Sequence, residues 1–363
     1  MRYKKQWRSS VIHICVLFFL ISALAACGRQ DSRTEDQLSS DHSSAEMAAD
    51  LSQEVSEISA SGEDQTEKSD KIQIGFVVKE NSRDYWIRMK EAAEQYCTEN
   101  GAELIYLAGT EDAVAAEQIA EVDQLIKDKV DAICISPVSD EMLFAALKRA
   151  GDAGIPVFTI DTDTAFTGRA AYIGTDNYAA ARAGAVYAAG QIGNGGTAVI
   201  LRGTLGDSVH DDRAEGIADG LTEQGITIVR TLCTMPADAG DDVVKLLQMY
   251  PDLDLLITTE DEITLAAWKR VLAVGNTGVR LYGFDGTEEI AALTEEDSQV
   301  LGTTAQDPEA IGIRAVETVL GYLENGNLKD TIIEIPYEII TPENAAEYIK
   351  QLPKDSDGEQ DYN

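Results

Sequence analysis

Basic residues are scarce in this sequence. Its 363 residues include 29 lysines and arginines against 64 aspartates and glutamates, so the formal net charge is −35. A chain this acidic has no general attraction for a phosphate backbone or an anionic lipid surface, and we expect no binding to nucleic acid. The hydrophobic share of 44% is that of a globular protein, and the length predicts two domains.

Histidine and cysteine are also rare. Of three histidines only His210 falls between residues 71 and 353, and the sequence has no Gly-x-Ser-x-Gly motif, so no hydrolase triad is indicated. Cys97, Cys134 and Cys233 are odd in number and widely spaced, which argues against a disulfide framework or a zinc motif. Cys134 and Cys233 lie in predicted strands and are expected to be buried. We expect no enzyme activity, no cofactor and no metal site.

An apolar run at residues 11–24 is shorter than the roughly 20 residues that span a bilayer. Four basic residues precede it, and it leads into Leu-Ala-Ala-Cys at positions 24–27. This pattern predicts a secretory signal peptide over residues 1–26. Leu-Ala-Ala-Cys resembles the lipobox of bacterial lipoproteins, which implies that Cys27 is lipidated and anchors the protein at the extracytoplasmic face of a bacterial membrane through lipid only. An uncleaved anchor and a plain signal peptide are the alternatives.

Aromatic residues are missing from residues 28–70, which contain 12 acids and three bases. Such a segment cannot bury enough apolar surface to offset the entropy of ordering, so residues 27–70 are predicted to form a lipidated, disordered acidic linker. Residues 354–363 form an acidic tail. The segment between them, residues 71–353, carries a net charge of −27.

Residues 71–353 alternate between strand and helix patterns. The predicted strands are 72–78, 103–108, 131–136, 156–160, 171–174, 198–201, 227–233, 255–258, 280–284 and 300–304. The predicted helices are 85–100, 113–127, 141–150, 177–191, 212–224, 241–249, 261–274, 288–293 and 308–324. This alternation predicts an α/β protein with parallel sheets covered on both faces, and the length predicts two similar doubly wound lobes.

Ligands of open α/β sheets bind outside the carboxyl ends of the strands. The segments that follow the predicted strands are polar and mostly acidic, and the first of them is accompanied by Tyr85 and Trp86. Carboxylates accept hydrogen bonds from hydroxyl groups, and aromatic faces pack on rings. The strand ends therefore predict a site for a small polar solute.

Six motifs carry a family resemblance: Val157-Phe158-Thr159-Ile160-Asp161, Gly174-Thr175-Asp176-Asn177, Arg213-Ala214-Glu215-Gly216, Thr259-Glu260-Asp261-Glu262, Leu281-Tyr282-Gly283-Phe284-Asp285-Gly286-Thr287 and Thr304-Ala305-Gln306-Asp307-Pro308. With them, residues 71 to about 352 resemble the type I periplasmic sugar-binding proteins, the ribose- and galactose-binding group that serves ABC importers. The resemblance implies a three-crossing hinge near Gly174, Gln306 and Ile335. It implies an N-terminal lobe of residues 71–174 plus 307–335 and a C-terminal lobe of residues 175–306 plus 336–353, which close on a ligand.

The resemblance also implies roles for individual residues. Asp161, Asp285 and Gln306 match positions that bind sugar hydroxyls, and Tyr85 and Trp86 match aromatics that pack on the sugar ring. The chain departs from the ribose-binding branch at several of the family's positions. Thr162 and Asp211 stand in place of arginines, Glu260 in place of an asparagine and Ala239 in place of an aromatic residue.

These departures make the expected pocket acidic. The expected ligand-binding residues are Arg83, Tyr85, Trp86, Asp161, Asp163, Asp211, Glu260, Asp285 and Gln306. Five acids against Arg83 would leave excess buried negative charge around a neutral ligand, which is unfavourable. The ligand is therefore expected to be a sugar or polyol, or a cationic solute such as an amino sugar or polyamine. Arg213 is expected to hold lobe structure by pairing with acids.

The sequence favours an extracytoplasmic solute-binding protein that delivers its ligand to the permease of an ABC importer. The alternative is a sensor lipoprotein that reports ligand occupancy to a membrane kinase or chemoreceptor, since both use the same lobe closure. A transcription regulator with the same core would need a helix-turn-helix and a basic face, whereas this N-terminus is apolar and then acidic.

Overall fold

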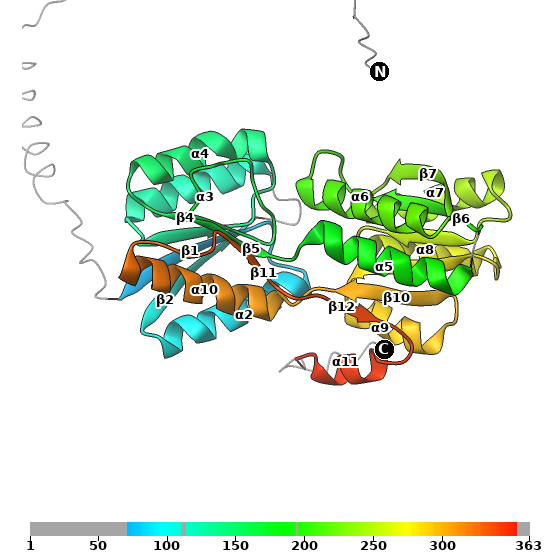
Figure 1. Ribbon diagram of the computed structural model, residues 1–363. Coiled ribbons are helices and arrows are strands. Elements are labelled where there is room, and N and C mark those ends of the chain that lie inside the picture. Colours follow the sequence, from blue (N-terminus) through cyan, green and yellow to red (C-terminus); the bar gives the residue numbers. More distant parts are fainter. Residues whose placement is uncertain (1–70, 110–113, 194, 354–363) are drawn as a thin grey trace, which may run out of the picture. The chain divides into compact units, whose positions relative to one another are not determined.

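The computed structural model describes residues 71–109, 114–193 and 195–353. They belong to one compact unit, Lys68–Asn363. Their strands form two six-stranded sheets with helices against them (Figure 1). The predicted signal peptide, the lipidated Cys27, the linker and the acidic tail lie outside the described residues.

The first sheet is parallel throughout, with strand order β11-β5-β4-β3-β1-β2. Its strands are β1 (Ile72–Val78), β2 (Ala102–Ala108), β3 (Ala132–Ile135), β4 (Val157–Ile160), β5 (Ala171–Gly174) and β11 (Ile332–Glu334). Its helices are α2 (Asp84–Glu99), α3 (Ala115–Asp128), α4 (Asp140–Asp152) and α10 (Pro308–Asn325). Because side chains alternate along a strand, Phe76 packs in one core with α2 and α10, while Val77 packs in the other with α3 and α4.

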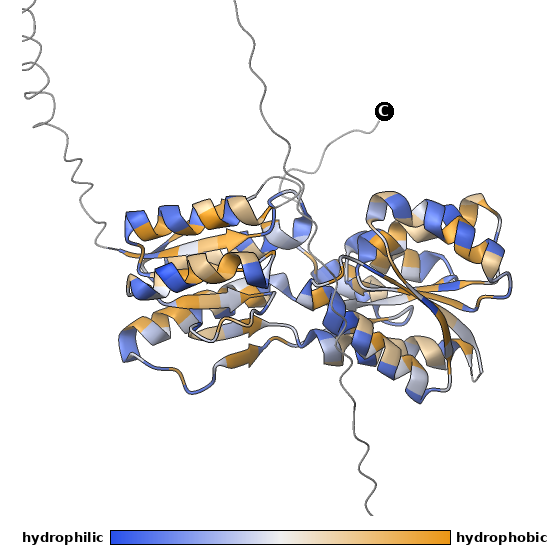
Figure 2. Cartoon of the chain, turned by 90° about the horizontal axis from the view of Figure 1, so that it is seen from above, coloured by the Kyte–Doolittle hydropathy of each residue, from blue (hydrophilic) through white to orange (hydrophobic). Residues whose placement is uncertain are grey.

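The second sheet repeats this plan with strand order β12-β10-β9-β8-β6-β7, and only β12 runs antiparallel, against β10. Its strands are β6 (Thr197–Arg202), β7 (Thr227–Cys233), β8 (Leu255–Thr258), β9 (Arg280–Asp285), β10 (Val300–Ala305) and β12 (Glu338–Ile340). Its helices are α5 (Asn177–Ile192), α6 (Ser208–Glu223), α7 (Pro236–Met249), α8 (Asp261–Ala273), α9 (Glu288–Glu296) and α11 (Ala345–Gln351). The strands of both sheets are mainly apolar, and the helices carry most of the polar residues (Figure 2).

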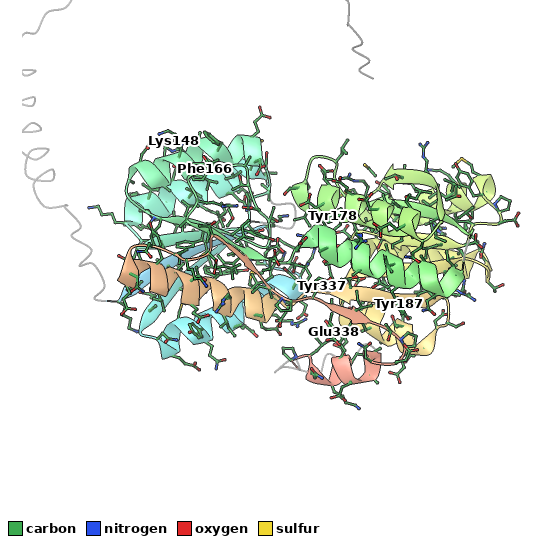
Figure 3. The ribbon with its side chains drawn as sticks, viewed as in Figure 1. Lys148, Phe166, Tyr178, Tyr187, Tyr337 and Glu338 are labelled. Carbon is green, nitrogen blue, oxygen red and sulfur yellow. The ribbon has the colours of Figure 1, made fainter. Side chains whose placement is uncertain are left out.

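Three short segments join the elements of the two sheets. Residues 175–176 lead from β5 to α5, residues 306–307 from β10 to α10, and residues 335–337 from β11 to β12. The third ends at Tyr337, which is labelled beside Glu338 at the start of β12 (Figure 3). We call the first sheet with its four helices the N-terminal lobe and the second sheet with its six helices the C-terminal lobe. The expected fold of two similar doubly wound lobes with a three-crossing hinge is confirmed.

The structure differs from the sequence prediction at several places. The short strands β11 and β12 and the helix α11 were not predicted, because three to seven residues carry too little periodicity. Helix α7 begins at Pro236 rather than at residue 241, since proline is well tolerated in a first helical turn. Cys134 is buried as expected, but the expectation for Cys233 is wrong. Cys233 is exposed because it ends β7, the edge strand of the second sheet.

Candidate ligand-binding site

The polar residues of the candidate site come from the strand ends of both lobes. Asp161 directly follows β4, Asp285 is the last residue of β9, and Gln306 directly follows β10. Tyr85 lies in the first turn of α2, and Arg213 lies in α6. Hydrogen bonds and charge interactions connect these residues, and we call the five of them the strand-end cluster.

Asp161 is held by three hydroxyl groups. Its Oδ1 accepts a 2.7 Å hydrogen bond from Tyr85, and its Oδ2 accepts bonds from Ser136 Oγ at 3.0 Å and Thr162 Oγ1 at 2.8 Å. Burial, followed by the charge of Asp161, raises the pKa of Tyr85 well above its usual value, so the phenol stays a donor. Asp161 also has φ of 60°, a left-handed conformation that is uncommon outside glycine and is often found at functional sites.

Asp285 is the second carboxylate held at positive φ, here 123°. Its Oδ1 accepts hydrogen bonds from Arg213 Nη1 and Gln306 Nε2, both at 2.9 Å. The other carboxylate oxygen, Oδ2, takes part in neither of these two hydrogen bonds. The next residue is Gly286, where an added Cβ would lie 2.3 Å from Ala305 Cβ, so the turn that presents Asp285 requires glycine.

Arg213 is almost completely buried, with 4% of its surface exposed. Its Nε donates to Asn177 Oδ1 and its Nη1 donates to the carbonyl oxygen of Thr259, both at 2.8 Å. The guanidinium also lies over the ring of Phe284, 3.9 Å from the ring centroid. Burial raises the pKa of Asp285, and the charge of Arg213 opposes that rise. Arg213 therefore provides the cation that balances Asp285. The expectation that Arg213 pairs with an acid is confirmed.

Gln306 contains a polar atom that has no partner in the described part of the chain. The residue is 5% exposed, its Nε2 is used by Asp285, and its Oε1 is buried with no hydrogen-bond partner among the described residues. Leaving such a buried acceptor unsatisfied costs about 1–3 kcal/mol. The amide is thus arranged for a donor that the described part of the chain does not supply.

Arg83 connects the beginning of α2 with the beginning of α8. Its Nε lies 2.6 Å from Glu80 Oε1 and 3.0 Å from Glu262 Oε1, and its Nη1 lies 3.8 Å from Glu260 Oε2. Burial, and then the charge of Asp285, raise the pKa of Glu260 to about 7, although Arg83 opposes this. Arg83 and Glu260 therefore lie beside the strand-end cluster and link the two lobes.

The structure places the two predicted aromatic residues differently. Trp86 is 5% exposed and belongs to the core of the N-terminal lobe with Met89 and Ala93. Tyr85 is only partly buried, and its ring meets Trp86 edge to face with centroids 5.1 Å apart. Of the two, Tyr85 belongs to the strand-end cluster through its bond to Asp161, while Trp86 packs against it from the core.

Two of the five predicted acids form ion pairs with arginines of their own lobes. Asp163 forms a two-pronged ion pair with Arg169, with both bonds at 2.6 Å. Asp211 pairs with Arg202. The expected excess of five acids over Arg83 alone is therefore incorrect for the cluster, because Arg213 is added and Asp163 and Asp211 are paired elsewhere.

Sequence reasoning missed four residues of the site. Ser136 and Thr259 bind cluster residues and follow strands, so the strand-end rule could have identified them. Asn177 ends the motif Gly174-Thr175-Asp176-Asn177, but no role was expected for it. Glu262 lies in the motif Thr259-Glu260-Asp261-Glu262, but its pairing with Arg83 was not expected, because that pairing depends on how α2 and α8 approach one another.

The only described histidine is not available as a base near neutral pH. Burial, followed by the charge of Arg213, lowers the pKa of His210 to about 3, and its Nδ1 lies 2.9 Å from Thr259 Oγ1. Within residues 71–109, 114–193 and 195–353, no three His, Cys, Asp or Glu side chains are grouped to hold a metal ion.

The chain has two α/β lobes, joined by three crossings, with polar residues at the strand ends. This arrangement is typical of two-lobed solute-binding proteins. The sequence model for the "Periplasmic binding protein domain" matches residues 74–327, and the chain belongs to this family. It is 27% identical over 250 residues to the ribose import binding protein of Escherichia coli (strain K12), covering 68% of this chain and 82% of that protein. It is 28% identical over 289 residues to the D-ribose/D-allose-binding protein of Pseudomonas aeruginosa, covering 76% of this chain and 90% of the relative.

A solved structure shares the fold. The ABC transporter solute-binding protein from Mycobacterium smegmatis, with bound glycerol, matches with a TM-score of 0.71 and 26% identity, covering 78% of this chain and 98% of that chain. These relatives are binding proteins, and this chain is a binding protein rather than an enzyme. No helix in the described part of the chain is long and apolar enough to cross a membrane.

Proposed function

We propose that this protein is a lipid-anchored extracytoplasmic receptor that closes on a neutral sugar or polyol and delivers it to an ABC importer. The observation that carries the proposal is the unpartnered Oε1 of Gln306 in a cluster of fixed donors and acceptors. Each sugar hydroxyl donates one hydrogen bond, so two neighbouring hydroxyls of one sugar can satisfy an amide oxygen and a carboxylate oxygen together. Relatives named for ribose, allose and xylitol support this ligand class.

The charges of the cluster favour a neutral ligand over a cationic one. Asp285 is balanced by Arg213, and Asp161 is satisfied by three hydroxyl donors. Glu260 has a pKa of about 7 and lies near Arg83, so it contributes only part of a negative charge at neutral pH. An amine is therefore not required to neutralise the site.

Isothermal titration calorimetry with the full chain tests this proposal. D-ribose, D-allose and xylitol are compared with D-glucosamine and 1,4-diaminobutane. We expect at least one neutral sugar or polyol to bind, and Gln306→Leu to weaken it about tenfold, the loss of one hydrogen bond to a buried group. Gln95→Leu, an exposed change on α2, is the matched control and should leave the affinity unchanged. Absence of binding by every neutral ligand would refute the proposal.

Transport and sensing use the same binding event, and the sensor lipoprotein is the second candidate function. Deletion of the gene distinguishes them. Loss of uptake of the radiolabelled ligand supports an importer, whereas intact uptake with lost ligand-dependent signalling supports a sensor. Lipid anchoring predicts that Cys27→Ser moves the protein from the membrane fraction to the soluble fraction.

A further inference from the structure

A cavity lies beside the first crossing, and none of the five residues of the strand-end cluster lines it. Its volume is about 390 Å³, within the range of small-molecule sites. Its walls come from the N-terminal lobe at Asp163, from the first crossing at Thr175, and from the C-terminal lobe at Asp212. We call it the hinge cavity.

The hinge cavity is strongly acidic. Five of its lining residues are carboxylates: Asp140, Asp163, Asp176, Asp212 and Glu334. No lysine, arginine or histidine is among the described residues that line it. One of the five charges is balanced from outside the lining by Arg169.

The remaining carboxylates lack cationic partners in the described part of the chain. Asp140 accepts only from the backbone of Ala165, and Asp176 caps α5 by accepting from the backbone of Ala179. Asp212 and Glu334 form no side-chain hydrogen bond or ion pair with any residue that the structure describes. Burial raises the pKa of Asp212, and the negative charges of neighbouring acids, Asp176 and Asp163 among them, raise it further.

A hydroxyl group supplies the second, independent indication of a ligand. Thr175 lines the cavity and is 1% exposed, and its Oγ1 is buried with no hydrogen-bond partner among the described residues. Its carbonyl oxygen, in contrast, accepts from the hydroxyl of Tyr172. The free Oγ1 can accept a hydrogen bond from an N–H group of a ligand.

The shape and lining of the cavity identify the class of ligand. The described acids are not grouped closely enough to hold a metal ion, and the volume far exceeds that of a bare ion. Val209 and Ile332 add apolar surface between the acids. We propose that the hinge cavity is a second binding site that takes a small aliphatic amine with more than one ammonium group, separate from the sugar site.

Calorimetry of the full chain with 1,4-diaminobutane at neutral pH and low salt tests this site. We expect one molecule to bind per chain. Asp212→Asn combined with Glu334→Gln should weaken binding at least about tenfold, because two charge-assisted hydrogen bonds are lost. Glu295→Gln combined with Glu296→Gln is the matched control, since both residues are exposed on α9 and the net charge changes equally. An equal loss in both double variants would overturn the proposal, because the attraction would then be non-specific.

Thr175→Val provides a test that does not depend on charge. Valine has nearly the same shape, and the removed hydroxyl has no partner, so the unfolding midpoint should not fall. Diamine affinity should fall about threefold or more with loss of one hydrogen bond. Unchanged affinity, or no heat of binding with the wild-type chain, would refute the site.

The hinge cavity is distinguished from the strand-end cluster by Asp285→Ala. This change should abolish sugar binding and leave the diamine affinity unchanged, since Asp285 does not line the hinge cavity. Loss of diamine binding in Asp285→Ala, together with displacement of the diamine by D-ribose, would place the amine in the strand-end cluster and overturn the proposal.

Discussion

Arg213 Nη1 lies 2.9 Å from Asp285 Oδ1, so a buried guanidinium of α6 balances the carboxylate that ends β9. The two side chains are 5% and 23% exposed, which places the pair largely out of solvent. Removal of one partner from such a pair leaves an uncompensated charge, whereas removal of both does not. This relationship makes Arg213 part of both the stability and the chemistry of the site.

Arg213→Met is therefore expected to lower the free energy of unfolding by about 3–5 kcal/mol. Adding Asp285→Asn should recover part of this loss, because the stranded carboxylate is removed. Urea denaturation of the two single variants and the double variant measures the coupling. Strictly additive effects would show that the pair does not interact.

Tyr85 and Trp86 are expected to respond differently to substitution. Trp86→Ala should destabilise the fold by about 3–5 kcal/mol, since it empties part of the core. Tyr85→Phe keeps the ring and loses only the bond to Asp161, so about 1 kcal/mol of stability is lost. Thermal unfolding of both variants checks the difference. A loss of stability that is larger for Tyr85→Phe than for Trp86→Ala would contradict the burial of Trp86.

Asp161 and Asp163 are two residues apart and are expected to differ in function. Asp161→Asn should weaken sugar binding at least about tenfold, because the carboxylate is the acceptor in the cluster. Asp163→Asn should change it little, because this residue faces Arg169. Calorimetry with the best neutral sugar compares the two variants. Equal losses would mean that both carboxylates contact the ligand.

Glu260 predicts a pH dependence of stability. Its pKa is about 7 in the folded chain against 4.5 for the ordinary side chain. Between these values the folded state holds a proton that the unfolded state has released, so the free energy of unfolding falls as the pH rises through this window. Glu260 should contribute roughly 2–3 kcal/mol to this fall.

Glu260→Gln removes the titrating group and is the control for this effect. Urea denaturation at pH 5 and pH 7.5 should show a smaller fall for the variant than for the wild-type chain. Comparison of the two proteins is needed because burial also raises the pKa of Asp261 and Asp285 in the same direction. Identical falls in both proteins would contradict the role of Glu260.

The sequence predicted the arrangement of strands and helices because each element carries its own periodicity. The strand-end rule selected the segments that contain Asp161, Asp285 and Gln306, and the family resemblance singled out these three residues. Whether they bind ligand stays a prediction. The sequence did not predict which acids have arginine partners. Asp163, which pairs with Arg169, and Asp211, which pairs with Arg202, were therefore counted in the pocket.

What the sequence by itself determined is the acidity of the chain, its two-lobed fold and the strand ends that carry polar residues. Only the tertiary structure decided how the acids are distributed. Two helices bring Arg213 to Asn177, and the turn after β9 brings Asp285 to the same guanidinium, so the strand-end cluster is nearly balanced. The unbalanced carboxylates lie instead in the hinge cavity, on elements that are distant in sequence. Electrostatic balance depends on distances of a few ångströms between such elements, which no local pattern encodes.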